Sequence, residues 1–200
     1  MHADWTVACA ADDPWVVVTW SRKDATICYI DLRAAPGRLN EIPEAAQYSC
    51  IAKALRRWNR PDTSLFTAKC DVWNYAAKFF DAEDLPGFDC AHGSYIDLLP
   101  IDPEIFSSFA TCERQLRMWT GIARSIDLPA SRCEWTLRRA RVLPSHLQPS
   151  VVTAKKSSPL DGFATSLYVW GYGSSQQSAA SAWAAALESL IEPVLLLVRQ

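Results

Sequence analysis

The sequence predicts an α+β fold, a two-layer sandwich in which a mixed, mainly antiparallel sheet of about seven strands packs against three helices. Two observations lead to this prediction. Runs of β-branched and aromatic residues alternate with segments whose apolar residues recur every three or four positions, the respective patterns of strands and helices. The chain has 200 residues, of which 50% are apolar and 21% charged, as expected for a single domain over residues 1–200.

Strands are expected where Val, Ile, Thr, Tyr and Trp gather. The first two runs, WVVVTW and ATICYIDL, are separated by a short polar turn and predict a hairpin. The last run, VLLLV after Pro193, is too short for a helix and is predicted as a buried strand. The expected strands are residues 15–20, 25–32, 64–73, 88–99, 132–143, 163–172 and 194–198.

The expected helices are residues 41–58, 102–126 and 174–191. Asn40 is the candidate N-cap of the first helix, and Asp102 followed by Pro103 makes a strong start for the second. An unbroken apolar seam from Ile105 to Ile126 predicts that the second helix is continuous. Because crossover connections are right-handed, the helices are expected on one face of the sheet.

The order strand–helix–strand suggests an internal repeat, with units at 25–73, 88–143 and 163–198. The first strand of each unit carries a related string, ATICYI, AHGSYI or ATSLYV. The alternative is that strands in general favour such residues. Residues 25–143 spell the ferredoxin-like order βαββαβ. In element order alone, the chain also resembles the reactive-intermediate deaminase and chorismate-mutase group of trimeric folds. No motif of that group is present, so the resemblance implies no function.

Charge and cysteine usage argue against several classes of protein. Lys and Arg number 20 and Asp and Glu 22, a net charge of -2, which argues against nucleic-acid binding. We expect neither a membrane span nor a signal peptide, since no apolar run is long enough. The seven cysteines include no C-x-x-C pair, so we expect a reduced, cytoplasmic protein with structural thiols and no metal site. No motif indicates a cofactor, and none is expected.

His92 is the predicted acid/base residue. Strand alternation places Cys90, His92 and Ser94 on one face of their strand, and a cysteine two residues from a histidine can support such chemistry. Tyr95, which points the other way, is the second catalytic candidate and would orient the ligand. The alternative is that His92 is a strand histidine bonded to a backbone group.

Arg139 and Arg141 are the predicted anion contacts, on a strand face that they share with Trp135. Two guanidinium groups in line could clamp a carboxylate or phosphate, while the Trp135 ring stacks on a planar ligand and Tyr168 orients it. The predicted cleft lies on the sheet between this strand and the strand of His92. The alternative is that the arginines leave the core for solvent or pair with acidic neighbours.

The helix 174–191 begins with a stretch, residues 174–187, that has no charged residue. Such a surface suits burial between layers or contact with another subunit, so a homo-oligomer through this helix is expected. The alternative is a solvated Ser/Gln face. The connection 144–161 contains three prolines and is long for a compact domain, so it is predicted to be a mobile lid or a disordered connector.

These features together predict a protein that binds a small anionic or aromatic molecule. If it is an enzyme, it performs acid/base chemistry on a small aromatic or carboxylate-bearing substrate. The alternative is a non-catalytic protein-interaction or assembly subunit. The sequence leaves open both the identity of the ligand and whether the protein is catalytic.

Overall fold

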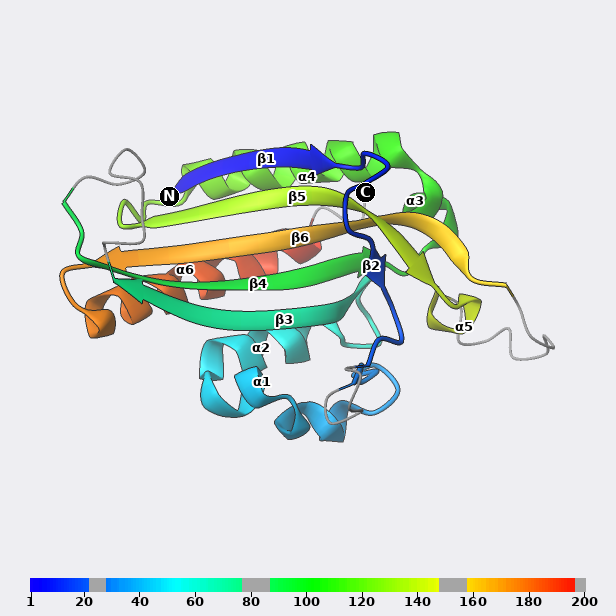
Figure 1. Ribbon diagram of the computed structural model, residues 1–200, viewed down its shortest axis with the longest axis horizontal. Helices are drawn as coiled ribbons and strands as arrows, with labels where there is room; N and C mark the ends of the chain where they lie inside the picture. Colours follow the sequence, from blue (N-terminus) through cyan, green and yellow to red (C-terminus); the bar gives the residue numbers. More distant parts are fainter. Residues whose placement is uncertain (22–27, 77–86, 148–157, 197–200) are drawn as a thin grey trace.

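A computed structural model describes residues 1–21, 28–76, 87–147 and 158–196 and shows an α+β fold built on one mixed sheet (Figure 1). In the described residues the sheet has six strands, in the order β1-β5-β6-β4-β3, with β2 added to β5. The strands are β1 His2–Ala8, β2 Val16–Val17, β3 Leu65–Ala76, β4 Cys90–Pro100, β5 Ser131–Val142 and β6 Leu160–Gly173.

Pairing is antiparallel between β3 and β4, between β4 and β6, and between β6 and β5. It is parallel between β5 and both β1 and β2. The predicted class, an α+β fold with a mixed, mainly antiparallel sheet, is therefore confirmed, with six described strands in place of about seven.

The larger helices cover one face of the sheet, and α6 lies in the middle of this layer between α2 and α4 (Figure 1). The indole N–H of Trp58 in α2 donates to the carbonyl oxygen of Ile191 at 3.0 Å, and that of Trp119 in α4 donates to Val194 at 3.2 Å. The second bond satisfies a carbonyl that the end of a helix leaves without an intrahelical donor. The helical elements are η1 Pro36–Glu41 (a 3-10 helix), α1 Pro43–Gln47, α2 Ser49–Trp58, α3 Pro103–Ser107, α4 Phe109–Ser125, α5 Pro144–Leu147 and α6 Gln176–Leu196.

A glycine lets α6 approach β6 closely. A Cβ atom on Gly171 would lie 1.9 Å from the backbone nitrogen of Trp183, so a larger residue would push the helix away. The close approach buries Trp183, whose indole N–H donates to Ser94 Oγ at 2.8 Å. Because α6 is buried between α2 and α4, and Ala179 and Ala186 also face the core, burial explains part of the absence of charged residues in 174–187.

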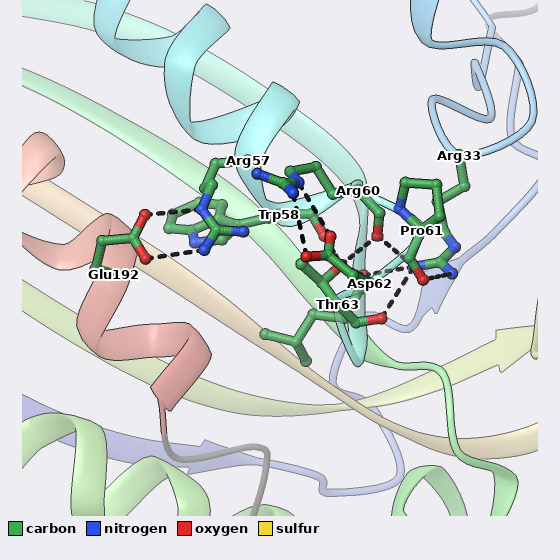
Figure 2. Close-up of polar contacts among 9 residues, drawn as sticks. Arg33, Arg57, Trp58, Arg60, Pro61, Asp62, Thr63 and Glu192 are labelled. Atoms are coloured by element: carbon green, nitrogen blue, oxygen red, sulfur yellow. Dashed lines mark hydrogen bonds and ion pairs between the residues drawn. The ribbon is translucent and has the colours of Figure 1, made fainter.

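Polar contacts tie the segment before η1 to the helical layer, as Figure 2 shows. Arg33 Nη1 donates to the carbonyl oxygens of Arg60 at 3.1 Å and Thr63 at 3.2 Å, in the loop after α2. On the opposite side of α2, Arg57 pairs with Glu192 of α6 at 2.7 Å. Arg33 Nη1 also donates to the carbonyl oxygen of Leu65 in β3 at 3.3 Å, so the segment that precedes η1 is fixed beside this edge strand.

Two of the predicted helices are each broken in two. Tyr48, with extended backbone angles, separates α1 from α2, and Ser108 separates α3 from α4. Asp102 caps α3 as predicted, whereas Asn40 caps nothing, because α1 starts at Pro43. Apolar spacing did not reveal the second break, because the apolar residues from Ile105 to Ile126 keep a helical period through it, although Phe109 is exposed.

Two predicted strands are not found among the described residues. In place of the hairpin there is a single bridge between Ser21 and Cys28, and residues 22–27 lie outside the described residues. Val194 and Leu195 continue α6 beyond Pro193 and are buried. An apolar run indicates burial but does not distinguish a strand from a helix, which explains why the strand prediction is wrong for residues 194–196.

These differences also change the order of elements. Of the three predicted units, only 88–143 shows strand–helix–strand order in the described residues, so the ferredoxin-like order of 25–143 is not seen. The two ends of the connection 144–161 belong to α5 and β6. The predicted lid falls mainly on residues 148–157, which lie outside the described residues.

As far as the structure describes the chain, the second face of the sheet carries no long helix. β2 and its flanking residues cross it near one end, together with α5 (Figure 1). Val16, Val18 and Leu147 pack there against Phe66 and Ala164. Within the described ranges, no helix is long and apolar enough to span a membrane.

Candidate functional site

A cavity of about 380 Å³ opens beside the edge strand β3. This volume lies within the range of small-molecule sites, roughly 300–1,000 Å³. The cavity is enclosed by β3, by Tyr95 of β4, by η1 and α1, and by the segment that leads into them. The described residues that line it are Trp20, Ser21, Cys28, Ile30, Leu32, Glu41, Ile42, Pro43, Glu44, Leu55, Thr67, Ala68, Lys69, Cys70, Asp71 and Tyr95.

A β-bulge in β3 forms one wall of the cavity. Thr67 pairs with Leu98 and Cys70 pairs with Ile96. Ala68 and Lys69 therefore face a single residue of β4, Asp97. Bulges commonly redirect a side chain beside a functional site.

Trp20 closes over this bulge. Its indole N–H donates to the carbonyl oxygen of Ala68 at 3.1 Å, and the ammonium of Lys69 lies 5.0 Å from the centre of its ring. The second contact is a cation–π interaction. Trp20 and Lys69 are thus held together at the same wall.

Three carboxylates line the cavity, but their surroundings differ. Glu41 is exposed and forms an ion pair with Arg38 at 2.7 Å. Glu44 is half-buried, and its Oε2 lies 3.9 Å from the thiol of Cys70, which donates to it. Asp71 is exposed, and its Oδ1 accepts from the backbone N–H of Val72 at 2.8 Å. Only the carboxylate of Glu41 has a basic side chain as its partner within the described residues.

Two further groups of the lining are held in the protonated form. Burial raises the pKa of Tyr95 well above its ordinary value, and the charges of Asp97 and Asp71 add to the rise. Burial likewise raises the pKa of the Cys70 thiol, with a contribution from Glu44. At neutral pH both groups are therefore hydrogen-bond donors rather than bases or nucleophiles.

Asp97 is a buried acid behind the bulge. It is 3% exposed, and Ser166 donates a hydrogen bond of 2.5 Å to its Oδ1. Burial raises the pKa of Asp97 to about 6, although the Ser166 hydrogen bond and the charges of Arg138 and Lys69 oppose the rise. A carboxylate in such a place needs nearby positive charge, which Lys69 and Arg138 supply.

An aromatic cluster continues from the cavity across the second face of the sheet. We define it as Trp73, Tyr95, Tyr168 and Trp170. Tyr95 and Tyr168 are register partners with ring centroids 5.7 Å apart, and the Tyr168 and Trp170 rings stack at 5.7 Å. Arg138 Nη2 donates to the Tyr168 hydroxyl at 2.9 Å. Tyr95 belongs to both the cavity and the cluster, so it links them.

The structure separates the two predicted catalytic residues. His92 lies on the face of β4 that α6 covers, 5% exposed, against Trp183 and Tyr48. The predicted grouping of Cys90, His92 and Ser94 on one face is consistent with the contact of Ser94 to Trp183. Tyr95 lies on the opposite face and lines the cavity. Its predicted orienting role stays a prediction, in a site that does not contain His92.

The predicted ligand contacts Arg139, Arg141, Trp135 and Tyr168 do not form one site either. Trp135 is fully buried against Trp119, with ring centroids 5.2 Å apart, and so offers no open ring face to a ligand. Arg139 and Arg141 both lie over the ring of Trp15. Arg141 also pairs with Asp161 at 2.6 Å, one of the alternatives considered for these arginines.

The predicted cleft requires a correction. A cleft between the strand of Arg139 and Arg141 and the strand of His92 is not possible, because β6 lies between those two strands in the sheet. Of the six predicted residues, the structure brings Tyr95 together with Tyr168, and Arg139 together with Arg141 over the ring of Trp15. Neither pair includes His92 or Trp135. Trp20, Lys69 and the acidic wall of the cavity are not predicted from the sequence, because neither the β3 bulge nor the path of the preceding segment leaves a pattern in the sequence.

A different histidine has an acidic partner. His146 Nδ1 lies 3.3 Å from Asp31 Oδ2, and the backbone N–H groups of Arg33 and Ala34 donate to Asp31 Oδ1. The hydrogen bond with His146 lowers the pKa of Asp31. This pair joins α5 to the segment before η1, so we interpret it as a structural link.

Comparison with known proteins adds no functional assignment. Nowhere in the described part of the chain do three or more His, Cys, Asp or Glu side chains gather in a way that could hold a metal ion. The chain matches no protein-family model, and the searches of curated proteins and of solved structures found no match.

Proposed function

We propose that this protein binds a small aromatic molecule in the cavity beside β3. The observation that carries the proposal is the combination of a 380 Å³ cavity with a lining of apolar side chains and a few convergent polar groups. This combination is typical of small-molecule sites. Trp20 and Tyr95 supply aromatic surface, and Lys69, Glu44 and Asp71 supply polar contacts.

Binding is better supported than catalysis. Neither His92 nor His146 is among the described residues of the cavity wall. Tyr95 and Cys70 have raised pKa values, so neither is prepared to accept a proton at neutral pH. If the protein is an enzyme acting on a small aromatic or carboxylate-bearing substrate, the acid/base candidates among the described lining residues are the carboxylates and Lys69.

Cys28 provides a direct test, because it lines the cavity and is the one exposed cysteine of the chain. Indole, as a neutral aromatic probe, should slow the alkylation of Cys28 by iodoacetamide, followed by mass spectrometry. Ser21→Trp should fill the cavity and remove this protection, whereas Ser174→Trp, at an exposed serine outside the cavity, should not. An alkylation rate of Cys28 that is independent of indole would contradict the proposal.

The second candidate function is a protein-interaction or assembly subunit that uses residues 174–191. The observation in its favour is that α6 exposes small uncharged residues, including Ser181 and Ala185. Light scattering over a range of concentrations tests it: an oligomer formed through α6 should dissociate in Ala185→Glu. A monomer at every concentration would argue against this candidate.

A further inference from the structure

The charges around the cavity indicate which aromatic molecules it favours. We propose that the ligand carries a single positive charge, as an aromatic amine does, and that Glu44 and Asp71 recognise this charge. The inference rests on the proposed function and makes it more specific. It also departs from the anionic ligand that the two arginines suggested.

The first step concerns Lys69, the one basic residue among the described lining residues. Its ammonium lies over the Trp20 ring at 5.0 Å and interacts electrostatically with the buried carboxyl of Asp97. Because Asp97 is buried behind the same bulge, the charge of Lys69 compensates an anion outside the cavity. Lys69 is therefore poorly placed to attract an anionic ligand.

The second step concerns the carboxylates. Arg38 compensates Glu41, which leaves Glu44 and Asp71 as the carboxylates of the described lining that have no basic partner there. Together with Asp97 they make three negative charges, against the two positive charges of Lys69 and Arg138. A ligand with one positive charge would balance this set.

The third step concerns geometry. The Cys70 thiol, a weak donor, contacts Glu44 Oε2 at 3.9 Å. An ammonium group would replace this contact with a charge-assisted hydrogen bond, which is roughly twice as strong as a neutral one. A carboxylate ligand in the same position would be repelled by Glu44 and Asp71. The apolar wall of Ile30, Leu32 and Leu55 would hold the aromatic ring.

Two probes with the same phenylethyl group and opposite charge test the inference, 2-phenylethylamine and 3-phenylpropionate. Isothermal titration calorimetry with the full chain at neutral pH should show the amine binding at least about tenfold more tightly than the acid. Glu44→Gln and Asp71→Asn should each weaken amine binding by about tenfold. Glu104→Gln and Asp127→Asn, at exposed positions outside this cavity, are the matched controls and should leave it unchanged.

The other outcomes separate the inference from the proposed function. If the acid binds as tightly as the amine, or more tightly, and Ser21→Trp abolishes its binding, the cavity is a ligand site but the inferred charge is wrong. If the amine binds equally well to Glu44→Gln and Asp71→Asn, these carboxylates do not recognise it and the inference fails. If neither probe binds, the inference and the proposed function both fail.

Discussion

His92 lies against Trp183 with ring centroids 4.4 Å apart, on the face of β4 that α6 covers. Within the described residues, its Nε2 atom is buried without a hydrogen-bond partner. Burial lowers the pKa of His92, so the ring is neutral at neutral pH. A neutral ring packed between Trp183 and Tyr48 has the surroundings of a core side chain.

Substitutions at His92 should separate packing from chemistry. His92→Ala should lower the free energy of unfolding by about 2 kcal/mol or more, because it leaves a space under α6. His92→Leu fills most of that space and removes a buried polar atom, so it should be close to neutral or stabilising. Urea unfolding measures both. If His92→Leu is as destabilising as His92→Ala, the imidazole makes a polar contact that this interpretation lacks.

The same histidine predicts a dependence of stability on pH. Its pKa in the folded protein is below the ordinary value of about 6.5, so the unfolded chain binds the proton more strongly. The contribution of His92 to stability is therefore present above about pH 6.5 and is lost as the pH falls below it. The free energy of unfolding of the wild type, relative to His92→Leu, should decrease between about pH 7 and pH 5. A constant difference over this range would show that His92 titrates normally.

Asp97 predicts a dependence of the opposite sign. Its pKa of about 6 in the folded protein exceeds the value of 3.8 expected without burial, so the folded protein binds the proton more strongly and acidification favours folding. Relative to Asp97→Asn, the wild type should gain up to about 3 kcal/mol of stability as the pH falls from 7 to 4. Urea unfolding at each pH measures the difference, in which His92 cancels. A loss of relative stability over this range would contradict the assignment.

Gly171 predicts a steric effect. Gly171→Ala places a methyl group against the backbone of Trp183 and should lower the free energy of unfolding by about 3 kcal/mol, because α6 must move. Gly37→Ala is the matched control, since nothing lies within 4 Å of an added Cβ there. Thermal and urea unfolding test the pair. Equal stability of the two variants would show that α6 does not pack on β6 as described.

The sequence predicted much of the fold because periodicity reports burial. The strands of residues 64–73, 88–99, 132–143 and 163–172 match β3, β4, β5 and β6, and Asp102 caps a helix as expected. The pattern did not show which face the helices cover. His92 and Tyr95 were correctly assigned to opposite faces, yet only the structure shows that α6 covers the side of His92.

The candidate site was harder to predict for a physical reason. The β3 bulge decides that Lys69 faces the cavity, and a bulge depends on pairing with a partner strand rather than on local sequence. The contact of Trp20 with Ala68 joins residues far apart in the chain. Tyr95 could be predicted as a site residue because strand alternation, a local pattern, assigns its side chain to one face of the sheet.

Hydrogen–deuterium exchange with and without 2-phenylethylamine tests the central claim most directly, namely that the ligand site is the cavity beside β3. The amine should slow exchange in peptides that cover residues 28–44 and 65–76, and should leave residues 131–142, which carry Arg139 and Arg141, unchanged. Slower exchange confined to residues 131–142 would contradict the claim and would show that the ligand binds at the strand of the two arginines.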